Sequence, residues 1–263
     1  MRMILKLSAL FLVLAFAVSC KKNGVSVAKE EIPQDVLTKI SALGFGTSTV
    51  QVHEDGYLVE GDIIITPAML NQTPDMKLMR VGTEEQYRTT NLVKALPRVI
   101  TVDVSTRLPQ SIFAATDEAI NRYNALGLRI SFQRVSSGGE ISIVKGAGNY
   151  LASAGFPSSG GDPYGQVKVN VTQLNGQPLG TTASVIAHEM GHCIGFRHTD
   201  YMNRSYSCGG SAVNEGASNV GAILIPGTPS GPDPNSWMLS CIGSGQNRPF
   251  NNNDKTALNY LYK

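Results

Sequence analysis

Three of the chain's four histidines lie within the eleven residues from His188 to His198. His188 and His192 are four positions apart, so on a helix they project from the same face, one turn above the other. At that spacing both imidazoles can bind a single metal ion. Gly195 then ends or loosens the helix, because a residue without Cβ can adopt the left-handed backbone that turns the chain back. This turn lets His198 approach the same ion from outside the helix.

Three neutral nitrogen ligands with an open fourth position are typical of catalytic zinc, whereas structural zinc is closed by four protein ligands. Glu189 lies directly beside the first histidine, where it can take a proton from a zinc-bound water whose pKa the metal lowers to about 7. As the water attacks a carbonyl carbon, the same carboxyl can pass the proton to the leaving amine. The sequence therefore predicts one catalytic Zn²⁺ held by His188, His192 and His198, with Glu189 as general base and acid.

The full motif reads HEMGHCIGFRH and fits the pattern HExxHxxGxxH, the zinc signature of metzincin peptidases. Metzincins also carry a methionine turn beneath the metal, and the stretch SWMLSC supplies Met238 for it, with an ordinary core methionine as the alternative. Together with IPGTPSGPDPNSWMLSC and NNNDKTALNYLY, the motif resembles the bacterial dual-action HEIGH metallopeptidases, a metzincin-like group. The resemblance covers roughly residues 95–263 and implies a secreted zinc endopeptidase with the ligands and base given above.

One feature of some metzincins is missing. These enzymes place a tyrosine two residues after the turn methionine, as a further zinc ligand or an oxyanion donor, and this chain has Ser240 there. Tyr201 and Tyr206 in the loop after the third histidine are the other candidates, although such tyrosines more often simply pack. The oxyanion-stabilising residue is therefore left unassigned.

Upstream, the tract from Val59 to Ile63 reads VEGDI and is similar to the F-x-G-D segment in the propeptides of astacin-type metzincins. There the aspartate binds the zinc and displaces the water, so the resemblance implies that Asp62 is a zinc-binding switch that keeps a zymogen inactive. A carboxylate suits the open metal position, and Gly61 permits a close backbone approach. Val59 replaces the usual phenylalanine, and an ordinary strand start is the alternative.

The first 19 residues indicate a secretory signal peptide. They comprise a short basic start, an apolar run too short to span a bilayer, and small side chains before Cys20. The position of Cys20 resembles the lipobox of bacterial lipoproteins, with an ordinary signal peptide as the alternative. We therefore expect lipidation at Cys20 and a location in the bacterial cell envelope or outside the cell, anchored to the outer membrane by the lipid.

The remaining cysteines are Cys193, Cys208 and Cys241. In an oxidising compartment an odd number implies one disulfide and one free or buried thiol. Cys208 and Cys241 both lie in loop-like sequence and are the preferred pair, although Cys193 could replace either.

Charge gives little support for a nucleic-acid partner. Loss of the signal peptide removes Arg2 and Lys6, which reduces the 22 basic residues to 20 and balances them against 20 acidic ones. The expected partners are a protein or peptide substrate and, through the N-terminal lipid alone, a membrane. We expect a monomer.

The predicted organisation has three parts: a signal peptide over residues 1–19, a tether and small N-terminal domain over 20–95, which we call the leader, and a zinc metallopeptidase domain over 96–263. An inhibitory role for the leader is a hypothesis. The leader is expected to hold a helix over 35–43, a hairpin turning at 55–56, a strand over 61–66 and a polar connector over 69–92.

The peptidase domain is expected to be α+β, with a mixed twisted sheet over the active-site helix and a C-terminal helix. Strands are predicted over 99–104, 129–135, 140–145 and 165–171, and helices over 110–126, 181–194 and 253–262, the last capped by Asn252 or Asn253. A Gly-rich loop is predicted over 146–161. The alternating strand 165–171 is the candidate for a cleft-rim strand that pairs with extended substrate, and an interior strand is the alternative.

Two rival functions fit parts of this pattern. A non-catalytic, zinc-containing surface adhesion or binding lipoprotein would keep the ligands for folding, but Glu189 argues against it because a structural site needs no carboxylate beside the open position. Hydrolysis of a non-peptide amide or of a glycan-linked cell-wall peptide is the second rival. The alternating strand 165–171 favours an extended peptide instead.

Overall fold

The computed structural model describes residues 31–43, 45–71, 86–214, 222–229 and 231–263. The predicted signal peptide and Cys20 therefore lie outside the described residues, as does most of the tether. The described residues from 32 to 263 form one compact unit. Within the described ranges, no helix is long and apolar enough to span a membrane.

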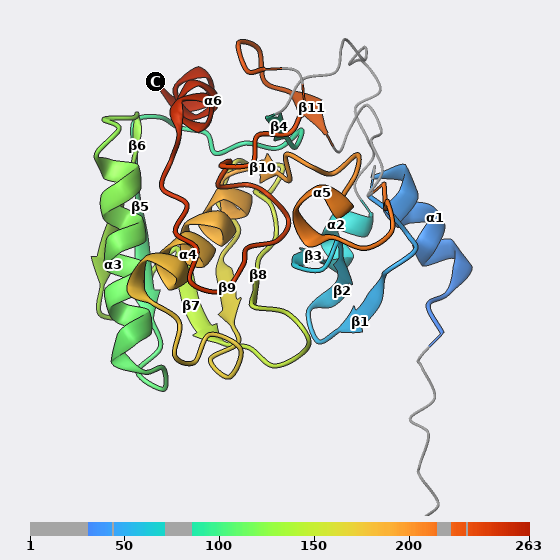
Figure 1. Cartoon of the computed structure of the whole chain (residues 1–263), viewed down its shortest axis with the longest axis horizontal. Coiled ribbons are helices and arrows are strands. Elements are labelled where there is room, and N and C mark those ends of the chain that lie inside the picture. Colours follow the sequence, from blue (N-terminus) through green and yellow to red (C-terminus); the bar gives the residue numbers. More distant parts are fainter. Residues whose placement is uncertain (1–30, 44, 72–85, 215–221, 230) are drawn as a thin grey trace, which may run out of the picture. The chain divides into compact units, whose positions relative to one another are not determined.

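A five-stranded mixed sheet in the order β6-β5-β7-β9-β8 is the framework of this unit (Figure 1). β5 is parallel to β6 and β7, β7 is parallel to β9, and β8 runs antiparallel to β9. Along β5 the side chains of Ile100, Val102 and Val104 alternate into the core, with the two-residue period of a strand. The five strands are β5 (Arg98–Val104), β6 (Ile130–Val135), β7 (Ile141–Lys145), β8 (Ala152–Ser153) and β9 (Gln166–Val169).

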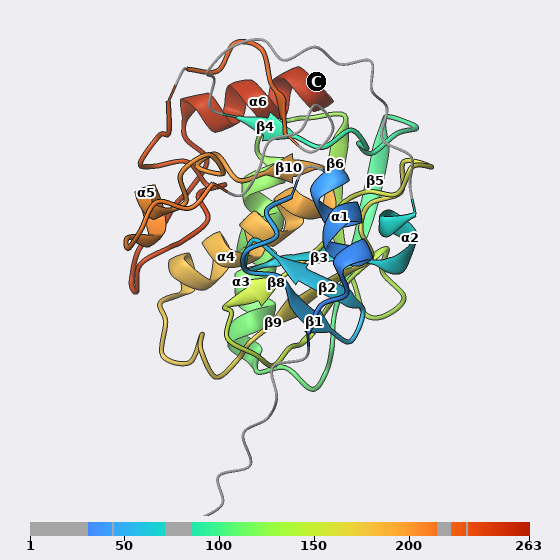
Figure 2. The ribbon, with the colours of Figure 1, turned by 90° about the vertical axis from the view of Figure 1, so that its right-hand side faces the viewer.

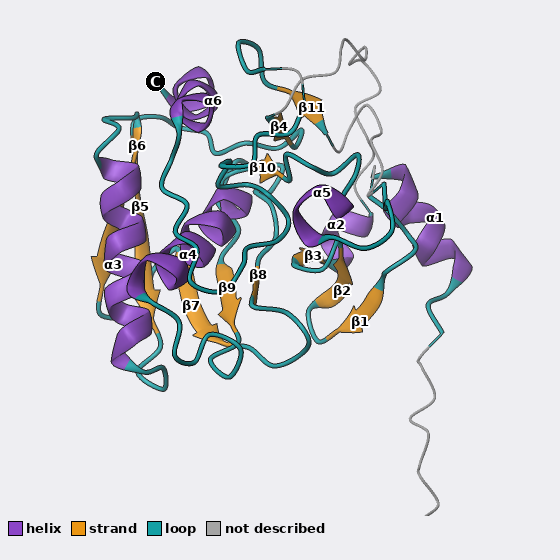
Figure 3. Cartoon of the chain, in the orientation of Figure 1, coloured by secondary structure: helices purple, strands orange, loops and turns teal. Residues whose placement is uncertain are grey.

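Two helices, α3 (Gln110–Asn124) and α4 (Leu179–Cys193), share one hydrophobic core with this sheet (Figure 3). The Tyr123 hydroxyl of α3 donates a hydrogen bond of 2.7 Å to the Ala187 carbonyl of α4. α3 is amphipathic, whereas every residue of α4 from Thr181 to Cys193 is buried. A helix that is buried on all its faces is an inner element of a fold, so α4 lies inside this unit.

The leader contains α1 (Gln34–Ala42), β1 (Gln51–His53), β2 (Gly56–Val59), β3 (Ile63–Ile65) and α2 (Pro67–Leu70). The three strands form an antiparallel sheet, and His53 pairs with Gly56 across the first turn. The predicted helix and hairpin are thus present, and the predicted strand 61–66 is shorter than expected. α1 lies against this sheet (Figure 2), where Ile40 and Phe45 join a hydrophobic cluster with residues of β2 and β3.

The prediction of a rim strand at residues 165–171 is wrong. β9 lies between β7 and β8, so it is an interior strand, the alternative reading of its pattern. The strand at this end of the sheet is β8, in the stretch 146–161 that was predicted to be a Gly-rich loop. The leader already hydrogen-bonds to this edge: Ile64 N donates to Ala154 O at 2.7 Å, and Ala154 N donates to Asp62 O at 2.9 Å.

A third, small sheet has the order β10-β4-β11 and was not predicted. Its strands are β4 (Tyr87–Arg88), β10 (Phe196–Arg197) and β11 (Ile223–Leu224). β4 belongs to the stretch 69–92 that was expected to be an irregular connector, of which residues 72–85 lie outside the described residues. Because β4 pairs with β10, the end of the leader supports the segment that leads into His198.

The chain closes with α6 (Asn252–Tyr262), as expected. Its N-cap is Asn251, not the predicted Asn252 or Asn253, because the side chains of Asn251 and Asp254 each accept from the other's backbone N–H in a capping box. The short α5 (Ser205–Cys208) ends at a disulfide between Cys208 and Cys241, and Cys193 is a buried free thiol. The predicted α+β fold, with a mixed sheet, an inner helix and a C-terminal helix, is confirmed.

Candidate metal centre

The inner helix α4 carries His188 and His192. Between them lies Gly191, where an added Cβ would lie 2.7 Å from Met238 Sδ and 3.1 Å from Trp237 Nε1. Glycine is therefore required for the close approach of this chain segment to the helix. Met238 is fully buried beside the helix, next to the turn that holds both histidines, where a methionine turn was expected.

The third histidine is brought in by the turn at Gly195. Gly195 has φ +105°, and an added Cβ there would lie 2.7 Å from Leu92 Cδ2 and 2.9 Å from Asn91 O. Both the backbone conformation and the packing thus favour glycine. The chain then continues as β10, and His198 follows it fully buried.

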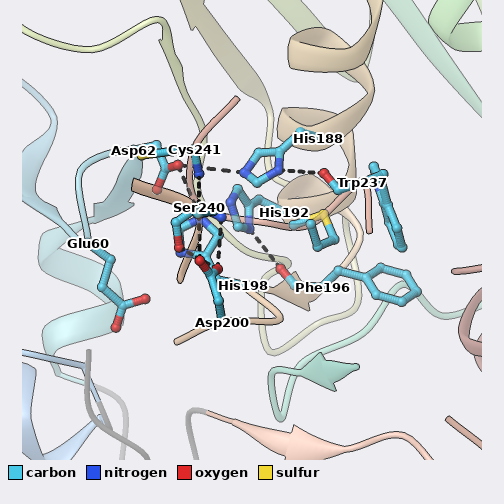
Figure 4. Close-up of polar contacts among 12 residues, drawn as sticks. Glu60, Asp62, His188, His192, Phe196, His198, Asp200, Trp237, Ser240 and Cys241 are labelled. Atoms are coloured by element: carbon cyan, nitrogen blue, oxygen red, sulfur yellow. Dashed lines mark hydrogen bonds and ion pairs between the residues drawn. The ribbon is translucent and has the colours of Figure 1, made fainter. Parts of the chain in front are cut away.

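Four side chains converge at this point (Figure 4). One ligand atom of each of Asp62, His188, His192 and His198 lies within 4.8 Å of the others. The Oδ2 atom of Asp62 is 3.1 Å from His198 Nε2 and 3.6 Å from His188 Nε2. The structure thus brings together the three predicted histidines and the predicted switch residue.

The hydrogen bonds of the two helix histidines fix their orientation. Nδ1 of His188 lies 2.9 Å from Trp237 O, and Nδ1 of His192 lies 2.7 Å from Phe196 O. Because a carbonyl can only accept, both Nδ1 atoms carry the proton, and the lone pair of each ring is on Nε2. Neither Nε2 atom has a hydrogen-bond partner among the described residues, although both are buried. Buried, unpartnered lone pairs that converge on one point fit a metal ion.

Burial dominates the electrostatics of the centre. Burial, followed by the repulsion that His188 and His198 exert when they are protonated, holds the pKa of His192 well below its usual range, which keeps it in the neutral, metal-binding form. Burial alone would raise the pKa of Asp62, but the neighbouring histidines, His198 most strongly, outweigh it and hold that pKa well below its usual range. Burial and the charge of Asp62 raise the pKa of Glu189, whose Oε2 has no partner among the described residues.

The leader delivers Asp62 through two consecutive residues with positive φ, Glu60 at +54° and Gly61 at +92°. The Arg204 guanidinium lies against Gly61, where an added Cβ would approach its Nη2 to 2.5 Å. Arg204 also donates from Nη1 to the Glu60 carbonyl oxygen. Glycine at position 61 therefore permits a close approach, as expected. The group that approaches it is the Arg204 guanidinium.

A second contact anchors the same turn. The Glu60 carboxylate, which points away from the histidines in Figure 4, forms an ion pair with Arg197, and both side chains are buried. The Arg197 guanidinium also lies 4.4 Å from the centroid of the Phe45 ring, so the leader covers it from two sides. The turn that precedes Asp62 is thus fixed to the segment that carries His198.

Sequence reasoning missed Glu60, Arg197 and Arg204, and no local spacing marks them. Asp200, which has no assigned role in the sequence analysis, accepts at Oδ1 from Ser240 N at 2.9 Å and from Ser240 Oγ at 2.8 Å. This contact ties the loop after His198 to the chain after Met238. The two tyrosine candidates differ in exposure: Tyr201 is buried against Tyr87, and Tyr206 is 42% exposed.

A second cluster of possible ligands, made of His53, Glu54 and Asp55, lies at the leader's hairpin turn. The Lys168 ammonium pairs with both Glu54 and Asp55. The Lys168 ammonium is therefore the cation of this cluster. The cluster forms an ion-pair contact between the leader and the five-stranded sheet.

The family model of the dual-action HEIGH metallo-peptidases matches residues 57–262. The chain belongs to this family, and the prediction of a metallopeptidase enzyme is confirmed. The match begins within β2, so it extends further toward the N-terminus than the resemblance noted in the sequence and includes Asp62.

Several solved structures are similar to this chain. One structure of myroilysin is 19% identical, covers 65% of this chain and 96% of that chain, and gives a TM-score of 0.39. A crystal structure of myroilysin is 15% identical, with coverages of 76% and 98% and a TM-score of 0.42. High choriolytic enzyme 1, a hatching enzyme zinc-protease from the medaka fish Oryzias latipes, is 20% identical, with coverages of 62% and 88% and a TM-score of 0.35. No curated protein sequence matches the chain significantly.

Proposed function

We propose that the chain is a zinc-dependent endopeptidase in which His188, His192 and His198 hold one ion and Glu189 is the general base and acid. The observation that carries this proposal is the convergence of the three imidazoles within 4.8 Å, with two buried Nε2 atoms that make no hydrogen bond among the described residues. When bound, zinc supplies a Lewis acid that activates water as a nucleophile at neutral pH. The donor set of three nitrogens and no thiolate is that of a catalytic site.

The chain's own groups then have separate roles. Trp237 O and Phe196 O keep the Nδ1 atoms of the two helix histidines protonated and their rings oriented. Glu189 is 2% exposed and lines the same cavity as His188, so its carboxylate can take a proton from the nucleophile and return it to the leaving amine. Met238 and Trp237, packed against Gly191, support the helix turn that carries both ligands.

We further propose that the full-length protein is latent. The Asp62 carboxylate lies within 4.8 Å of the three imidazoles, where it would occupy the open position of a bound ion in place of water. The backbone of residues 62–64 also occupies the outer edge of β8 through its hydrogen bonds with Ala154. An extended substrate could add to the sheet at that edge only after the leader has moved away.

The proposed location is the bacterial cell envelope, with the mature chain attached to the outer membrane by a lipid on Cys20. Its support is the sequence of the first 20 residues. Metabolic labelling with palmitate tests it: label in the wild-type protein and none in Cys20→Ser is expected, and equal labelling of both would reject lipidation at Cys20.

The proposed activity is tested by zinc content and casein cleavage of the purified soluble form. We expect one zinc per chain in the wild type and in Glu189→Ala, and its loss in His192→Ala. Cleavage by the wild type and not by Glu189→Ala would establish the peptidase. Zinc in both with cleavage by neither leaves two readings, a latent zymogen and a non-catalytic zinc-containing binding lipoprotein, and Asp62→Ala separates them because only the zymogen becomes active.

A further inference from the structure

A cavity of about 240 Å³ opens beside His188 and Glu189. One wall is the face of α4 one turn before the ligands, where Ser184 and Val185 precede His188 and Glu189 by four residues each. The other walls are the segments 149–152 and 239–242. The cavity therefore adjoins the reacting centre and is the right size for a substrate side chain next to the scissile bond.

Four acidic or basic side chains line this cavity among the described residues. Of the described residues around it, the carboxylates are Glu189, which is the proposed base, and Asp62, which belongs to the leader. The cations are the guanidiniums of Arg204 and Arg248. Once the leader has moved, Arg248 lines a cavity whose remaining carboxylate among the described residues, that of Glu189, is occupied with catalysis.

Arg248 is held in place without a carboxylate. Its Nη1 donates to Cys241 O at 2.7 Å, its Nη2 to Gln246 Oε1 at 3.3 Å, and its backbone N to Ser184 Oγ at 2.8 Å. Among the described residues, no carboxylate oxygen lies within the 4.0 Å of an ion pair with this guanidinium. Burial lowers the pKa of Arg248, and Asp200 and Asp254 offset this only from a distance. A guanidinium has five N–H donors, so further donors are available to a ligand.

The rest of the cavity wall is largely apolar, with Leu151, Val185, Leu239 and Ile242 among its residues. A bound side chain must therefore offer both hydrocarbon and an anionic end. Glutamate meets both conditions, because its methylenes can contact the apolar walls while its carboxylate pairs with a guanidinium, in two parallel hydrogen bonds when the geometry allows.

We infer that this cavity binds an acidic side chain of the substrate, glutamate in particular, next to the scissile bond, and that Arg248 determines this preference. The inference rests on the proposed endopeptidase function and names its substrate class. Arg248 has no role in the proposed chemical step, so its removal alters which peptide is cleaved and leaves the reaction the same.

The test uses the full chain with Asp62→Ala, so that the leader's carboxylate does not compete for the cavity. Fluorogenic peptides identical except for Glu, Gln or Lys on either side of the cleavage point are compared. We expect kcat/KM for the best Glu peptide to exceed that of its Gln counterpart about tenfold, which corresponds to about 1.4 kcal/mol. In Arg248→Gln the Glu-to-Gln ratio should fall to about one, Arg248→Lys should retain part of it, and the exposed Arg107→Gln should leave it unchanged.

Binding provides a second readout that does not depend on turnover. In Asp62→Ala/Glu189→Ala, fluorescence anisotropy should give a Kd for the Glu peptide about tenfold lower than for the Gln peptide, and Arg248→Gln should abolish the difference. Equal Kd values for the two peptides, or a preference that survives Arg248→Gln, would overturn the inference. Failure to cleave any peptide while the Kd difference holds would instead count against the peptidase proposal alone.

Discussion

Oδ2 of Asp62 lies 3.1 Å from Nε2 of His198, although 136 positions of sequence separate the two residues. The contact places a leader carboxylate among the three histidines of the metal centre. It is supported on both sides, by the hydrogen bonds of residues 62–64 to Ala154 and by the Glu60–Arg197 ion pair. The latency of the full-length protein should therefore depend on Asp62 and on the contacts that hold it.

Asp62→Ala should raise the casein cleavage rate of the full-length protein by about tenfold or more, because the loss of one ligand-like contact of about 1.4 kcal/mol shifts occupancy of the site by that factor. Initial rates at equal zinc content measure it. The matched control is Asp35→Ala, which removes an exposed carboxylate from α1 of the same leader. An unchanged rate in Asp62→Ala would reject the switch.

The Glu60–Arg197 pair should contribute more to stability than the Glu54–Lys168 pair, which also joins the leader to the peptidase domain. Glu60→Ala leaves the buried Arg197 guanidinium without this carboxylate, and breaking a buried pair costs about 3–5 kcal/mol. Glu54→Ala is the control, because the Glu54 side chain is 74% exposed and Lys168 keeps Asp55 as a second partner, so the loss should be about 1 kcal/mol or less. Denaturant unfolding should separate the two variants; equal losses would show that burial of the pair is unimportant.

Local sequence was enough to predict the zinc motif. His188, Glu189 and His192 share one helix, and Gly195 marks its end, so their geometry follows from helical periodicity and from the conformational freedom of glycine. Asp62 was identified by its resemblance to a propeptide segment. The residues that hold Asp62 in place could not be predicted, because Glu60 and Arg197 meet only through the tertiary fold and nothing in their spacing connects them.

The wrong predictions about the fold have similar causes. In the alternating stretch 165–171 the polar position Lys168 is buried and pairs with Glu54 and Asp55, so a polar residue there did not mean exposure. Alternation alone does not distinguish an edge strand from an interior one. β8 is only two residues long, too short for any periodicity. At the last helix, consecutive asparagines are equally good caps, and the choice of Asn251 depends on Asp254 three residues later.

Burial raises the pKa of Asp254 to about 6, despite hydrogen bonds from Gln86, Ser236, and the backbone of Asn251 and Trp237. In the unfolded chain an aspartate has a pKa of about 3.9, so between about pH 4 and pH 6 the folded state binds more protons. The free energy of unfolding should therefore fall as pH rises through this window, by up to about 3 kcal/mol.

Asp254→Asn should remove this dependence. Denaturant unfolding of both proteins from pH 4 to pH 7, at constant zinc, gives the difference between them and cancels the other titrating groups. The unfolding free energy of the wild type minus that of Asp254→Asn should decrease as pH rises to about 6 and stay constant above it. A difference that is constant with pH would contradict the raised pKa.

The Cys208–Cys241 disulfide should stabilise the loops beside the metal centre. It closes a segment with a sequence separation of 33, for which the loop-entropy relation gives about 4 kcal/mol. Cys208→Ser/Cys241→Ser should lose about that much unfolding free energy relative to the oxidised wild type. Adding a reductant should destabilise the wild type and leave the double variant unchanged; a reductant effect on both would point to a different cause.

The most direct test of the central claim is casein cleavage by Asp62→Ala beside Asp62→Ala/Glu189→Ala, with the zinc content of each measured on the same sample. Both proteins keep all three histidines and lack the Asp62 carboxylate, so they differ only in the proposed base, Glu189. We predict one zinc per chain in both and cleavage by the first alone. Equal cleavage by both proteins would contradict the assignment of Glu189, and with it the proposed mechanism.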